Sequence, residues 1–219
     1  MADFTVHSIP GSPYGRAVLI ALEEKGAAYE FSPVAPGTFR SPEHLARHPF
    51  GKVPVLDHGD FRLFETQAIL RYLDRVLPTP ALTPADPRAA GRMDQVMNIN
   101  DCYLFNGVSN TIGFQRVVGP RLMGLKPDEA VIEAALPRGR DVFGALAGLL
   151  GGQPYFTGES VSLADIMLAP QLDFFRDIPE WEILAGPYPS LAAWLERMNA
   201  RPSLQKTTWE RVAELAQAA

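Results

Sequence analysis

The residues best suited to chemistry follow the first predicted strand, in the segment Ser12-Pro13-Tyr14-Gly15-Arg16. In a layered α/β fold, ligands bind beyond the carboxyl ends of the strands, so the Ser12 hydroxyl could meet a ligand there. Ser12 could instead only cap the next helix, because serine followed by proline is a favoured helix start. No histidine or acid lies at a spacing that suggests a catalytic triad. A hydroxyl can also donate a hydrogen bond to a bound thiolate, which favours the nucleophilic form of a thiol.

A second set of polar residues flanks two predicted helices. Arg40 and Lys52 are cations on either side of a short helix, and Glu65-Thr66 begins a later one. Together they could hold a small zwitterion: the cations would bind a carboxylate, Glu65 an ammonium group, and Thr66 with the free helix-start amides a second carboxylate. Taken singly, each residue is explained by surface charge or by compensation of the helix dipole. Only the joint pattern indicates a site.

The stretch from Phe50 to Asp74 predicts a strand, a tight turn, a second strand and a helix. Pro54 cannot donate to a sheet ladder, so it must lie at an edge, a bulge or a turn, although Val53 and Val55 beside it are strand formers. The turn is assigned to His58-Gly59-Asp60. The amides at the start of the following helix suit a small anion, especially a carboxylate.

Composition excludes several classes of protein. The chain has 219 residues, is 47% hydrophobic and carries a net charge of -5, which favours a globular protein and argues against nucleic-acid or anionic-membrane binding. No signal peptide or transmembrane helix is visible, so the expected compartment is the cytoplasm. The single cysteine, Cys102, excludes an intramolecular disulfide and is expected to be a buried small hydrophobe. The histidines lack metal-ligand spacing and are expected in loops or at the surface, so no metal is predicted: His7, His44, His48 and His58.

The order of predicted elements indicates two domains. Residues 1–77 alternate strands and helices, residues 78–87 form a proline-rich linker, and residues 88–219 read as helices only. The helices expected in the second part span residues 88–118, 128–150 with an interruption near Pro137, 162–175, 189–200 and 203–216. Within it, Ser162 and Asp165 have the spacing of a capping box, which fixes a buried helix and performs no chemistry.

Three separated motifs then match a known family over nearly the whole chain. SPYGRAVLIALEEKG resembles the first loop and helix of serine-type cytosolic glutathione transferases, and SPEHLARHPFGKVPVL followed by LFETQAILRYL is similar to the glutathione-binding half of phi-like and bacterial theta-like members. YFTGESVSLADIMLAP resembles the capping motif of the family's helical domain. The resemblance implies a thioredoxin-like N-terminal domain, an all-helical C-terminal domain, glutathione as cosubstrate and a homodimer.

The resemblance also implies roles for individual residues. Ser12 would stabilise the glutathione thiolate, and Val53 would pair its backbone with the cysteinyl part, ahead of a cis-proline at Pro54. Glu65 and Thr66 would bind the γ-glutamyl end. The remaining binding residues depart from the family pattern: Arg40 stands where lysine is usual, Lys52 where glutamine is common, Thr66 where serine is common, and Phe39 replaces a polar residue beside Arg40.

The electrophile pocket is expected between the two domains. Its candidate residues flank the thiol loop or lie on the first long helix of the second domain: Tyr14, Phe39, Tyr103, Phe105, Phe114 and Arg116. The aromatic residues on that helix could equally be core or dimer contacts, and Asp94 or Asp101 could reach across a dimer to the γ-glutamyl amine.

Three functions follow from the resemblance. The first is conjugation of the glutathione thiolate to a small hydrophobic electrophile. The second uses the same thiolate in a glutathione-dependent peroxidase, reductase or dehalogenase reaction. The third is a binding protein of the same fold without useful turnover. Because Ser12-Pro13-Tyr14-Gly15 stands where thioredoxin-like oxidoreductases carry Cys-x-x-Cys, disulfide exchange with proteins is not expected.

Overall fold

The computed structural model describes residues 3–35 and 37–218, which form two compact units. The first unit contains the chain up to Leu82 and resumes at Ala200, whereas the second comprises Thr83–Asn199. The sequence had assigned everything after residue 87 to one helical domain. The structure therefore adds the last part of the chain to the unit that contains the sheet.

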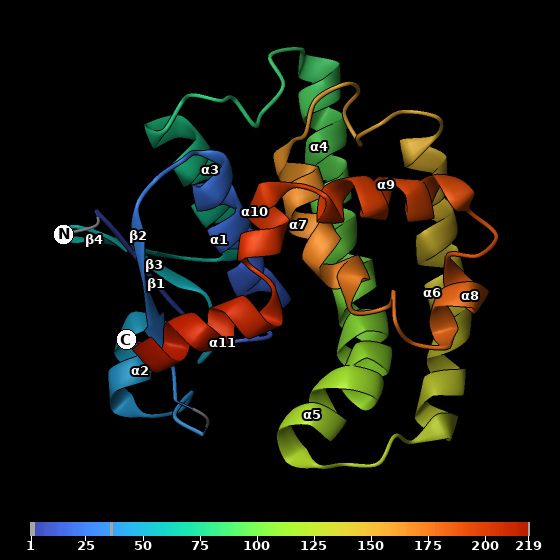
Figure 1. Ribbon diagram of the computed structural model, residues 1–219, viewed down its shortest axis with the longest axis horizontal. Helices are drawn as coiled ribbons and strands as arrows, with labels where there is room; N and C mark the ends of the chain where they lie inside the picture. The colour runs from blue at the N-terminus through green and yellow to red at the C-terminus, as the bar shows by residue number, and fades with distance from the viewer. Residues whose placement is uncertain (1–2, 36, 219) are drawn as a thin grey trace. The chain divides into compact units, whose positions relative to one another are not determined.

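The first unit is built on a four-stranded mixed sheet (Figure 1). Its strands, in the spatial order β2-β1-β3-β4, are β1 (Phe4–Ser8), β2 (Tyr29–Pro33), β3 (Val55–His58) and β4 (Phe61–Phe64). The first two strands run parallel, and the other neighbours are antiparallel. The strand predicted before Ser12 and the strand–turn–strand predicted around His58-Gly59-Asp60 are confirmed.

Short-range signals set the starts of the first two helices of this unit. Ser12 and Ser41 have extended backbones, each is followed by proline, and each side chain accepts a hydrogen bond from the backbone amide three residues on. These contacts satisfy amides that a helix start leaves without an intrahelical partner. The helices before the linker are α1 (Pro13–Glu24), α2 (Pro42–Arg47) and α3 (Thr66–Val76).

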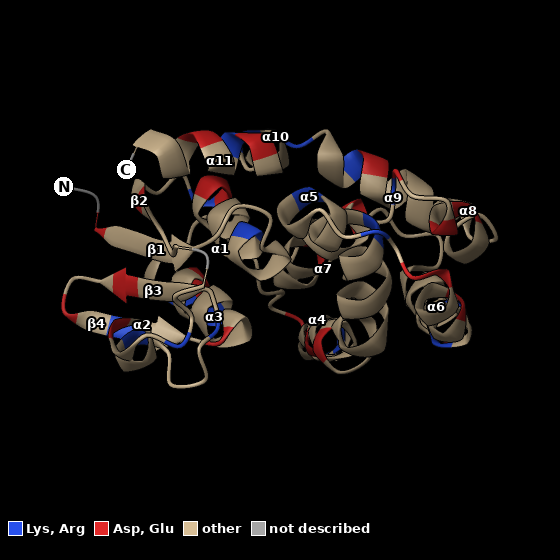
Figure 2. Ribbon diagram, turned by 90° about the horizontal axis from the view of Figure 1, so that it is seen from below, with Lys and Arg blue, Asp and Glu red and all other residues tan. Residues whose placement is uncertain are grey.

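The C-terminal segment of the first unit packs on α1 and β2 as two helices, α10 (Pro202–Lys206) and α11 (Trp209–Ala218) (Figures 1 and 2). The sequence predicted one helix over residues 203–216, and this was wrong. The chain leaves the helix at Thr207, whose buried hydroxyl donates 2.8 Å to the carbonyl oxygen of Ser203. This side-chain bond ends the first helix locally, and the second starts two residues later.

A bidentate ion pair anchors this segment to the end of α1. Arg201 Nε and Nη2 each lie 2.7 Å from a Glu24 carboxylate oxygen, and the Ser203 hydroxyl donates to the same carboxylate. Burial alone would raise the pKa of Glu24, but the hydrogen bonds from Arg201 and Ser203 outweigh it and hold the pKa below its usual value. Lys206 adds a second pair, 2.9 Å from Glu23.

The second unit contains helices only, within the described residues. They are α4 (Pro87–Ile99), η1 (Asn100–Val118), α5 (Gly119–Met123), α6 (Glu129–Leu150), α7 (Leu163–Asp173), α8 (Glu180–Leu184) and α9 (Pro189–Asn199). The sequence predicts one long helix over residues 88–118, and a kink within η1 corrects this. Asn106 has φ/ψ of -75°/100° and Gly107 of 98°/-3°, so the helix is broken there. Positive φ is readily adopted by glycine, which lets the chain turn at this point.

The predicted interruption of α6 at Pro137 is also wrong, because the helix continues through it to Leu150. Proline removes one amide donor and leaves the carbonyl of residue Glu133 without its helical partner. Both Pro137 and Glu133 are exposed, so water can satisfy that carbonyl.

The core of the second unit is organised around Asp165 at the start of α7. The carboxylate is fully buried and accepts four hydrogen bonds of 2.7 to 3.0 Å, from the Ser162 amide and hydroxyl, the Phe156 amide and the Trp194 indole. The capping box predicted for Ser162 and Asp165 is therefore confirmed. Burial raises the pKa of Asp165, and the four donors oppose that rise.

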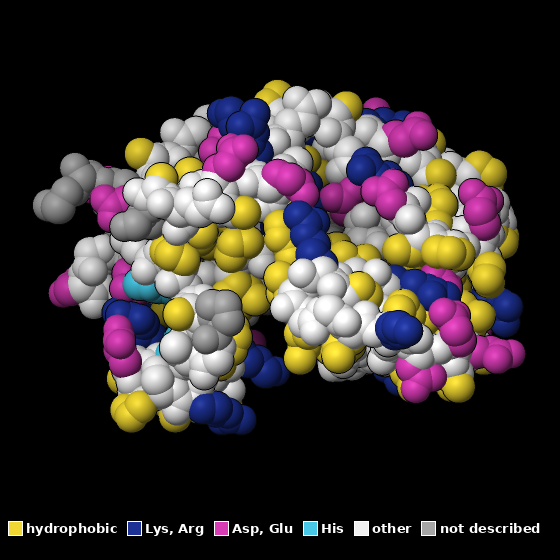
Figure 3. Space-filling model, turned by 60° about the horizontal axis from the view of Figure 1, so that its bottom comes forward, with side chains coloured by type: hydrophobic (Ala, Val, Ile, Leu, Met, Phe, Trp, Pro, Cys, Tyr) yellow, Lys and Arg dark blue, Asp and Glu magenta, His cyan; other side chains and the backbone are white. Residues whose placement is uncertain are grey.

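One face of the molecule is mixed in charge. On the face drawn in Figure 3, basic and acidic side chains are interspersed rather than gathered into fields of one sign. Among residues 3–35 and 37–218, no helix is long and apolar enough to cross a membrane.

Candidate functional site

The sheet topology brings the predicted binding segments of the first unit to one end of the sheet. Ser8 ends β1 beside Pro33, which ends β2, while Val55 begins β3 beside Phe64, which ends β4. His7 pairs with Val55, so the end of β1 lies beside the start of β3. The segments that leave or enter the strands at this end carry Ser12, Arg40, Val53 and Glu65. Strand order thus brings the ends of the strands that adjoin these segments together at one end of the sheet.

Ser12 lies at the boundary between a tight turn and α1. Its amide donates 3.2 Å to the carbonyl oxygen of Ile9, and Gly11 within the turn has φ of 81°. Proline and then glycine at the two central positions are the signature of a type II turn. The Ser12 hydroxyl oxygen accepts the Gly15 amide at 3.0 Å, so the helix cap predicted as one reading of this serine is present. A hydroxyl has one hydrogen to donate besides its acceptor sites, so capping leaves that hydrogen for another partner.

The loop that carries Phe39 and Arg40 packs directly on Gly51. A Cβ on Gly51 would lie 2.5 Å from the Phe39 carbonyl oxygen and 3.3 Å from Arg40 Cδ, and Gly51 has φ of 62°. The backbone therefore requires glycine here for two reasons, close approach and conformation. This contact places the exposed Arg40 beside the segment that continues into Lys52.

Lys52 and Val53 are held from behind by His44. The His44 ring is buried, and its Nε2 lies 2.9 Å from the Lys52 carbonyl oxygen, so this nitrogen must donate. The next peptide bond, Val53–Pro54, is cis, as the resemblance implies. Val53 precedes the first paired residue of β3, so its backbone groups lie outside the ladder between β1 and β3.

Glu65 has the most unusual backbone of the site. Its φ of 72° is the only positive value of a non-glycine residue in the described part of the chain. Such residues are uncommon, cost of order 1–3 kcal/mol and cluster at functional sites. Glu65 is the last residue before α3, where it is exposed and forms no side-chain cap, and the buried Thr66 is the first residue of that helix.

His48 lies among the predicted binding residues. Burial lowers its pKa, the negative charge of Glu65 opposes this, and the charges of His44 and Lys52 lower it further. The ring is 4.8 Å from that of Phe64, centroid to centroid. His7 is buried as well and bonds to Asp57 at 2.9 Å. The prediction that the histidines lie in loops or at the surface was therefore wrong for His7, which is buried in β1, and for His44, which is buried in α2. His48 follows the end of α2 in a loop, as predicted, although it is buried there.

The predicted electrophile-pocket residues are divided between the two units. Tyr14 and Phe39 are half-buried in the first unit. The Phe39 ring lies edge-on to the His44 ring, with 5.7 Å between the ring centroids. The others lie on η1 in the second: Tyr103, which is 55% exposed, with Phe105, Phe114 and Arg116, which are half-buried. Their role in a pocket stays a prediction.

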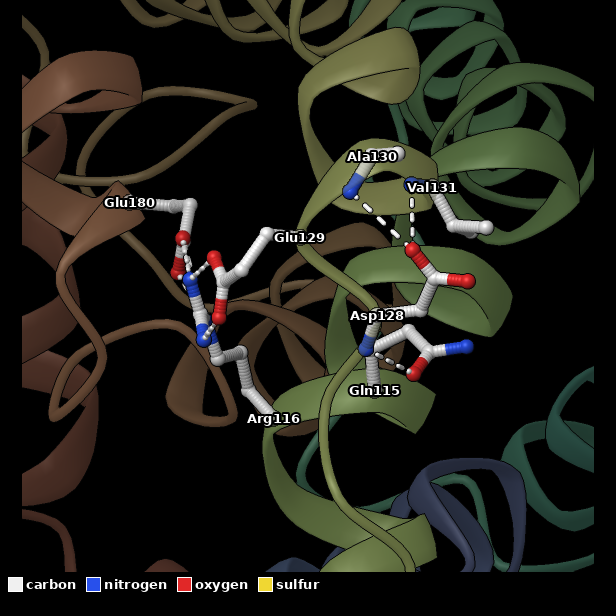
Figure 4. Close-up of polar contacts among 7 residues, drawn as sticks. All are labelled: Gln115, Arg116, Asp128, Glu129, Ala130, Val131 and Glu180. Carbon is white, nitrogen blue, oxygen red and sulfur yellow. Dashed lines mark hydrogen bonds and ion pairs between the residues drawn. The ribbon is translucent and has the colours of Figure 1, made fainter.

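Arg116 is held by two carboxylates of its own unit (Figure 4). Its guanidinium makes a bidentate pair with Glu129, at 2.6 and 2.7 Å, and approaches Glu180 to 2.6 Å. The hydrogen bonds that Arg116 donates to Glu180 and, second in effect, to Glu129 raise the pKa of Arg116 above its usual value. Glu180 is buried, whereas Glu129 is exposed, so this cluster joins η1 to the starts of α6 and α8.

Cys102 is exposed on η1, so the prediction of a buried cysteine was wrong. The carbonyl oxygen of the same residue accepts 3.0 Å from Arg138 Nη2. Asp94 lies on α4 and Asp101 on η1. Within residues 3–35 and 37–218, no group of three or more His, Cys, Asp or Glu side chains is placed to hold a metal ion.

Sequence reasoning missed the residues that support the site from behind. Gly15 packs on Ser8, Gly11 packs on Trp209, and His44 holds the Lys52 carbonyl. A glycine at the start of a helix, where better helix formers are the rule, was the only local signal of these contacts.

Two family models match the chain. The glutathione S-transferase N-terminal domain matches residues 2–75, and the glutathione S-transferase C-terminal domain matches residues 129–197. A probable glutathione S-transferase of Oryza sativa subsp. japonica, GSTF1, is 32% identical over 86% of this chain and 88% of its own length. Glutathione S-transferase F14 of Arabidopsis thaliana is 33% identical over 94% of this chain and 84% of its own length.

Solved structures of similar proteins agree. Glutathione transferase F7 from Populus trichocarpa superimposes with a TM-score of 0.84 at 26% identity, over 97% of this chain and 99% of its own. Glutathione S-transferase-I bound with the ligand lactoylglutathione has a TM-score of 0.83 at 30% identity, and the match covers 98% of this chain and 100% of that one.

Proposed function

Because this chain belongs to the glutathione S-transferase family and is a glutathione transferase, we propose that it conjugates the glutathione thiolate to small hydrophobic electrophiles, with Ser12 as its catalytic residue. The observation that carries the proposal is the state of the Ser12 hydroxyl. Its oxygen already accepts the Gly15 amide at 3.0 Å, so its hydrogen can be donated to sulfur. The positive N-terminal end of the α1 dipole also favours the negatively charged thiolate over the thiol.

The reaction needs a thiolate at neutral pH. A free thiol has a pKa of about 8.5, and a hydrogen bond to the charged form lowers it. The thiol proton passes to solvent. Sulfur then attacks an electrophilic carbon, a sulfur–carbon bond forms, and the leaving group departs with its electron pair. Addition to an activated double bond would follow the same course, with solvent returning a proton to the adjacent carbon.

The other ends of glutathione have chemically matched residues in the first unit. Arg40 and Lys52 are exposed cations suited to the glycyl carboxylate. Val53 offers backbone groups outside the sheet ladder to the cysteinyl part, beside Pro54. Glu65 would bind the α-ammonium group, and Thr66 with the first amides of α3 the α-carboxylate.

We also propose that the protein is a homodimer that works in the cytoplasm, in the detoxification of reactive compounds. The support for the dimer is Phe50, a large hydrophobic residue that is 61% exposed although Phe64 and His48 form an aromatic cluster with it. Light scattering of wild type and Phe50→Ser would test this, with a shift toward monomer expected for the variant. A wild-type protein that is monomeric at micromolar concentration would rule the dimer out. Asp94 and Asp101 remain candidates for contacts across it.

The catalytic proposal is tested with Ser12→Ala. Loss of one donor to a developing or bound anion is expected to lower kcat/KM with chlorodinitrobenzene by roughly a hundredfold. The pKa of the bound thiol, read from thiolate absorbance, should rise. Affinity for S-methylglutathione, which has no thiol, should be nearly unchanged. Ser41→Ala is the matched control, because Ser41 caps α2 in the same way, before a proline. It should leave the thiol pKa unchanged.

Unchanged turnover and thiol pKa in a folded Ser12→Ala protein would remove Ser12 from the mechanism. Product analysis distinguishes the other uses of the thiolate. A conjugate indicates transfer, oxidised glutathione without halide indicates peroxide removal or another reduction, and oxidised glutathione together with released halide indicates reductive dehalogenation. Binding of glutathione without any product would indicate a binding protein.

A further inference from the structure

The indole of Trp209 lies against the turn that precedes Ser12. A Cβ built on Gly11 would lie 2.4, 2.5 and 2.6 Å from Trp209 Cη2, Cζ3 and Cζ2. Real Cβ contacts are essentially never this short, so the ring occupies the space that a side chain at position 11 would need. Both residues belong to the first unit, although 198 positions separate them in the chain.

The turn transmits any movement of Gly11 directly to Ser12. Gly11 is the residue before Ser12, and the Ser12 amide closes the turn on the Ile9 carbonyl oxygen at 3.2 Å. From Ser12 onward the chain is fixed by the cap to Gly15 and by the first helical bond from the Arg16 amide, at 2.8 Å. The Ser12 side chain is therefore placed by the helix on one side and by the turn on the other.

The segment that carries Trp209 is anchored independently of this contact. Arg16 Nη2 donates 3.2 Å to the Leu204 carbonyl oxygen, and the Glu24–Arg201 pair secures the beginning of the segment at the far end of α1. A flat ring on a braced helix is a stiff support, because a tryptophan side chain has only two rotatable bonds.

We propose that Trp209 is a positioning residue for catalysis, which holds the Gly11 turn so that the Ser12 hydroxyl is aimed at the glutathione sulfur. This inference rests on the proposed role of Ser12. It assigns to the C-terminal helix α11 a function in the thiol site, exerted through Gly11 rather than by contact with the reacting atoms.

The test compares Trp209→Ala, Trp209→Leu and Trp209→Phe with wild type in the full chain. Trp209→Ala should raise the pKa of the bound thiol by about one unit, which lowers the thiolate fraction and kcat/KM near neutral pH by about tenfold. Trp209→Phe, which keeps a flat ring on Gly11, should recover most of the loss. Trp209→Leu keeps apolar bulk without the ring and should resemble Trp209→Ala, which covers the case in which the alanine protein does not fold.

Lys206→Ala is the matched control, since it removes the exposed ion pair to Glu23 from the same segment. Its thiol pKa and kcat/KM should equal those of wild type. The double variant Ser12→Ala/Trp209→Ala should be no slower than Ser12→Ala, because a residue that acts only through Ser12 has no effect once Ser12 is gone.

Failure of this inference can be told apart from failure of the Ser12 proposal. If Ser12→Ala is slow but the folded Trp209 variants keep the wild-type thiol pKa, Trp209 does not position Ser12. A raised KM for the electrophile at unchanged thiol pKa would contradict positioning too, because it indicates contact with the electrophile instead. If Ser12→Ala itself is fully active, both inferences fall together.

Discussion

Gly15 packs so closely on Ser8 that a Cβ at position 15 would lie 2.0 Å from the Ser8 hydroxyl oxygen and 2.9 Å from Ser8 Cβ. The same Gly15 supplies the amide that bonds to Ser12. The end of β1 and the start of α1 are thus in direct contact beneath the proposed catalytic residue. The Ser8 hydroxyl forms no hydrogen bond within the described residues, so its place there is one of packing.

This contact predicts a pair of substitutions that compensate each other. Gly15→Ala should destabilise the protein by about 1–3 kcal/mol through overpacking and should lower transferase activity, because the displaced amide no longer fixes Ser12. Adding Ser8→Gly removes both clashing atoms and should restore most of the activity. Thermal unfolding and kcat/KM measure the two effects.

The control for this pair is Gly91→Ala, also in the first turns of a helix. A Cβ there meets no atom within 4 Å, so alanine should stabilise by up to about 1 kcal/mol. If Gly15→Ala changes the stability of the protein by the same amount as Gly91→Ala, the close packing of Gly15 on Ser8 does not contribute to stability.

The Glu24–Arg201 pair predicts a pH dependence of stability. The pKa of Glu24 is lowered on folding, so the pair contributes stability above the unfolded-state pKa of about 4.3, and this contribution is lost as pH falls through the lower folded-state value. The melting temperature of Glu24→Gln should therefore lie below that of wild type at pH 7, and the gap should narrow as the solution is acidified below about pH 4.

Calorimetry at several pH values provides the measurement for this pair. Glu43→Gln, which removes the exposed partner of Arg47, should change the melting temperature little at any pH. A difference in melting temperature between Glu24→Gln and wild type that stays constant down to pH 2 would contradict a lowered pKa of Glu24 in the folded protein.

Asp165 predicts a large loss of stability from a small chemical change. In Asp165→Asn an amide group replaces one oxygen, so at least one of the four buried donors faces another donor and the remaining bonds lose their charge, at a cost of roughly 2–4 kcal/mol. Ser162→Ala removes one of the four bonds and should cost only about 1 kcal/mol. Urea unfolding monitored by tryptophan fluorescence would compare them, and equal midpoints for the two variants would contradict this view of the carboxylate.

The Arg116 cluster predicts unequal effects for its two carboxylates. Arg116→Met leaves the buried Glu180 without its partner, which should cost about 3 kcal/mol in the helical unit. Glu129→Gln should change little, because Glu129 is exposed. Urea midpoints for both variants test this. A urea midpoint for Arg116→Met equal to that of wild type would show that the cluster does not stabilise the helical unit.

Much of the first unit was predictable because its signals are local. The Ser-Pro start of α1 and the turn at His58-Gly59-Asp60 each depend on a few adjacent residues, and the structure has them at the expected positions. The cis bond at Pro54 was different, since it followed from the family resemblance and not from the residues around it.

The features that could not be predicted depend on contacts between distant parts of the chain. The assignment of residues 200–218 to the sheet unit rests on partners such as Arg201 and Glu24, which no periodicity pairs. The buried ring of His44 bonds to the Lys52 carbonyl oxygen, and Cys102 is exposed although its residue type favours burial. A residue type alone does not report such surroundings.

The anchoring of α10 and α11 on α1 also bears on the order in which the protein can assemble. A ribosome releases the strands and first helices early, but Arg201, Leu204 and Trp209 emerge only after the whole helical unit has been made. Until then the end of α1 and the Gly11 turn lack the partners that cover them. The residues of the proposed thiol site are thus synthesised before the helical unit, but the contacts that cover the site can form only after that unit has been made.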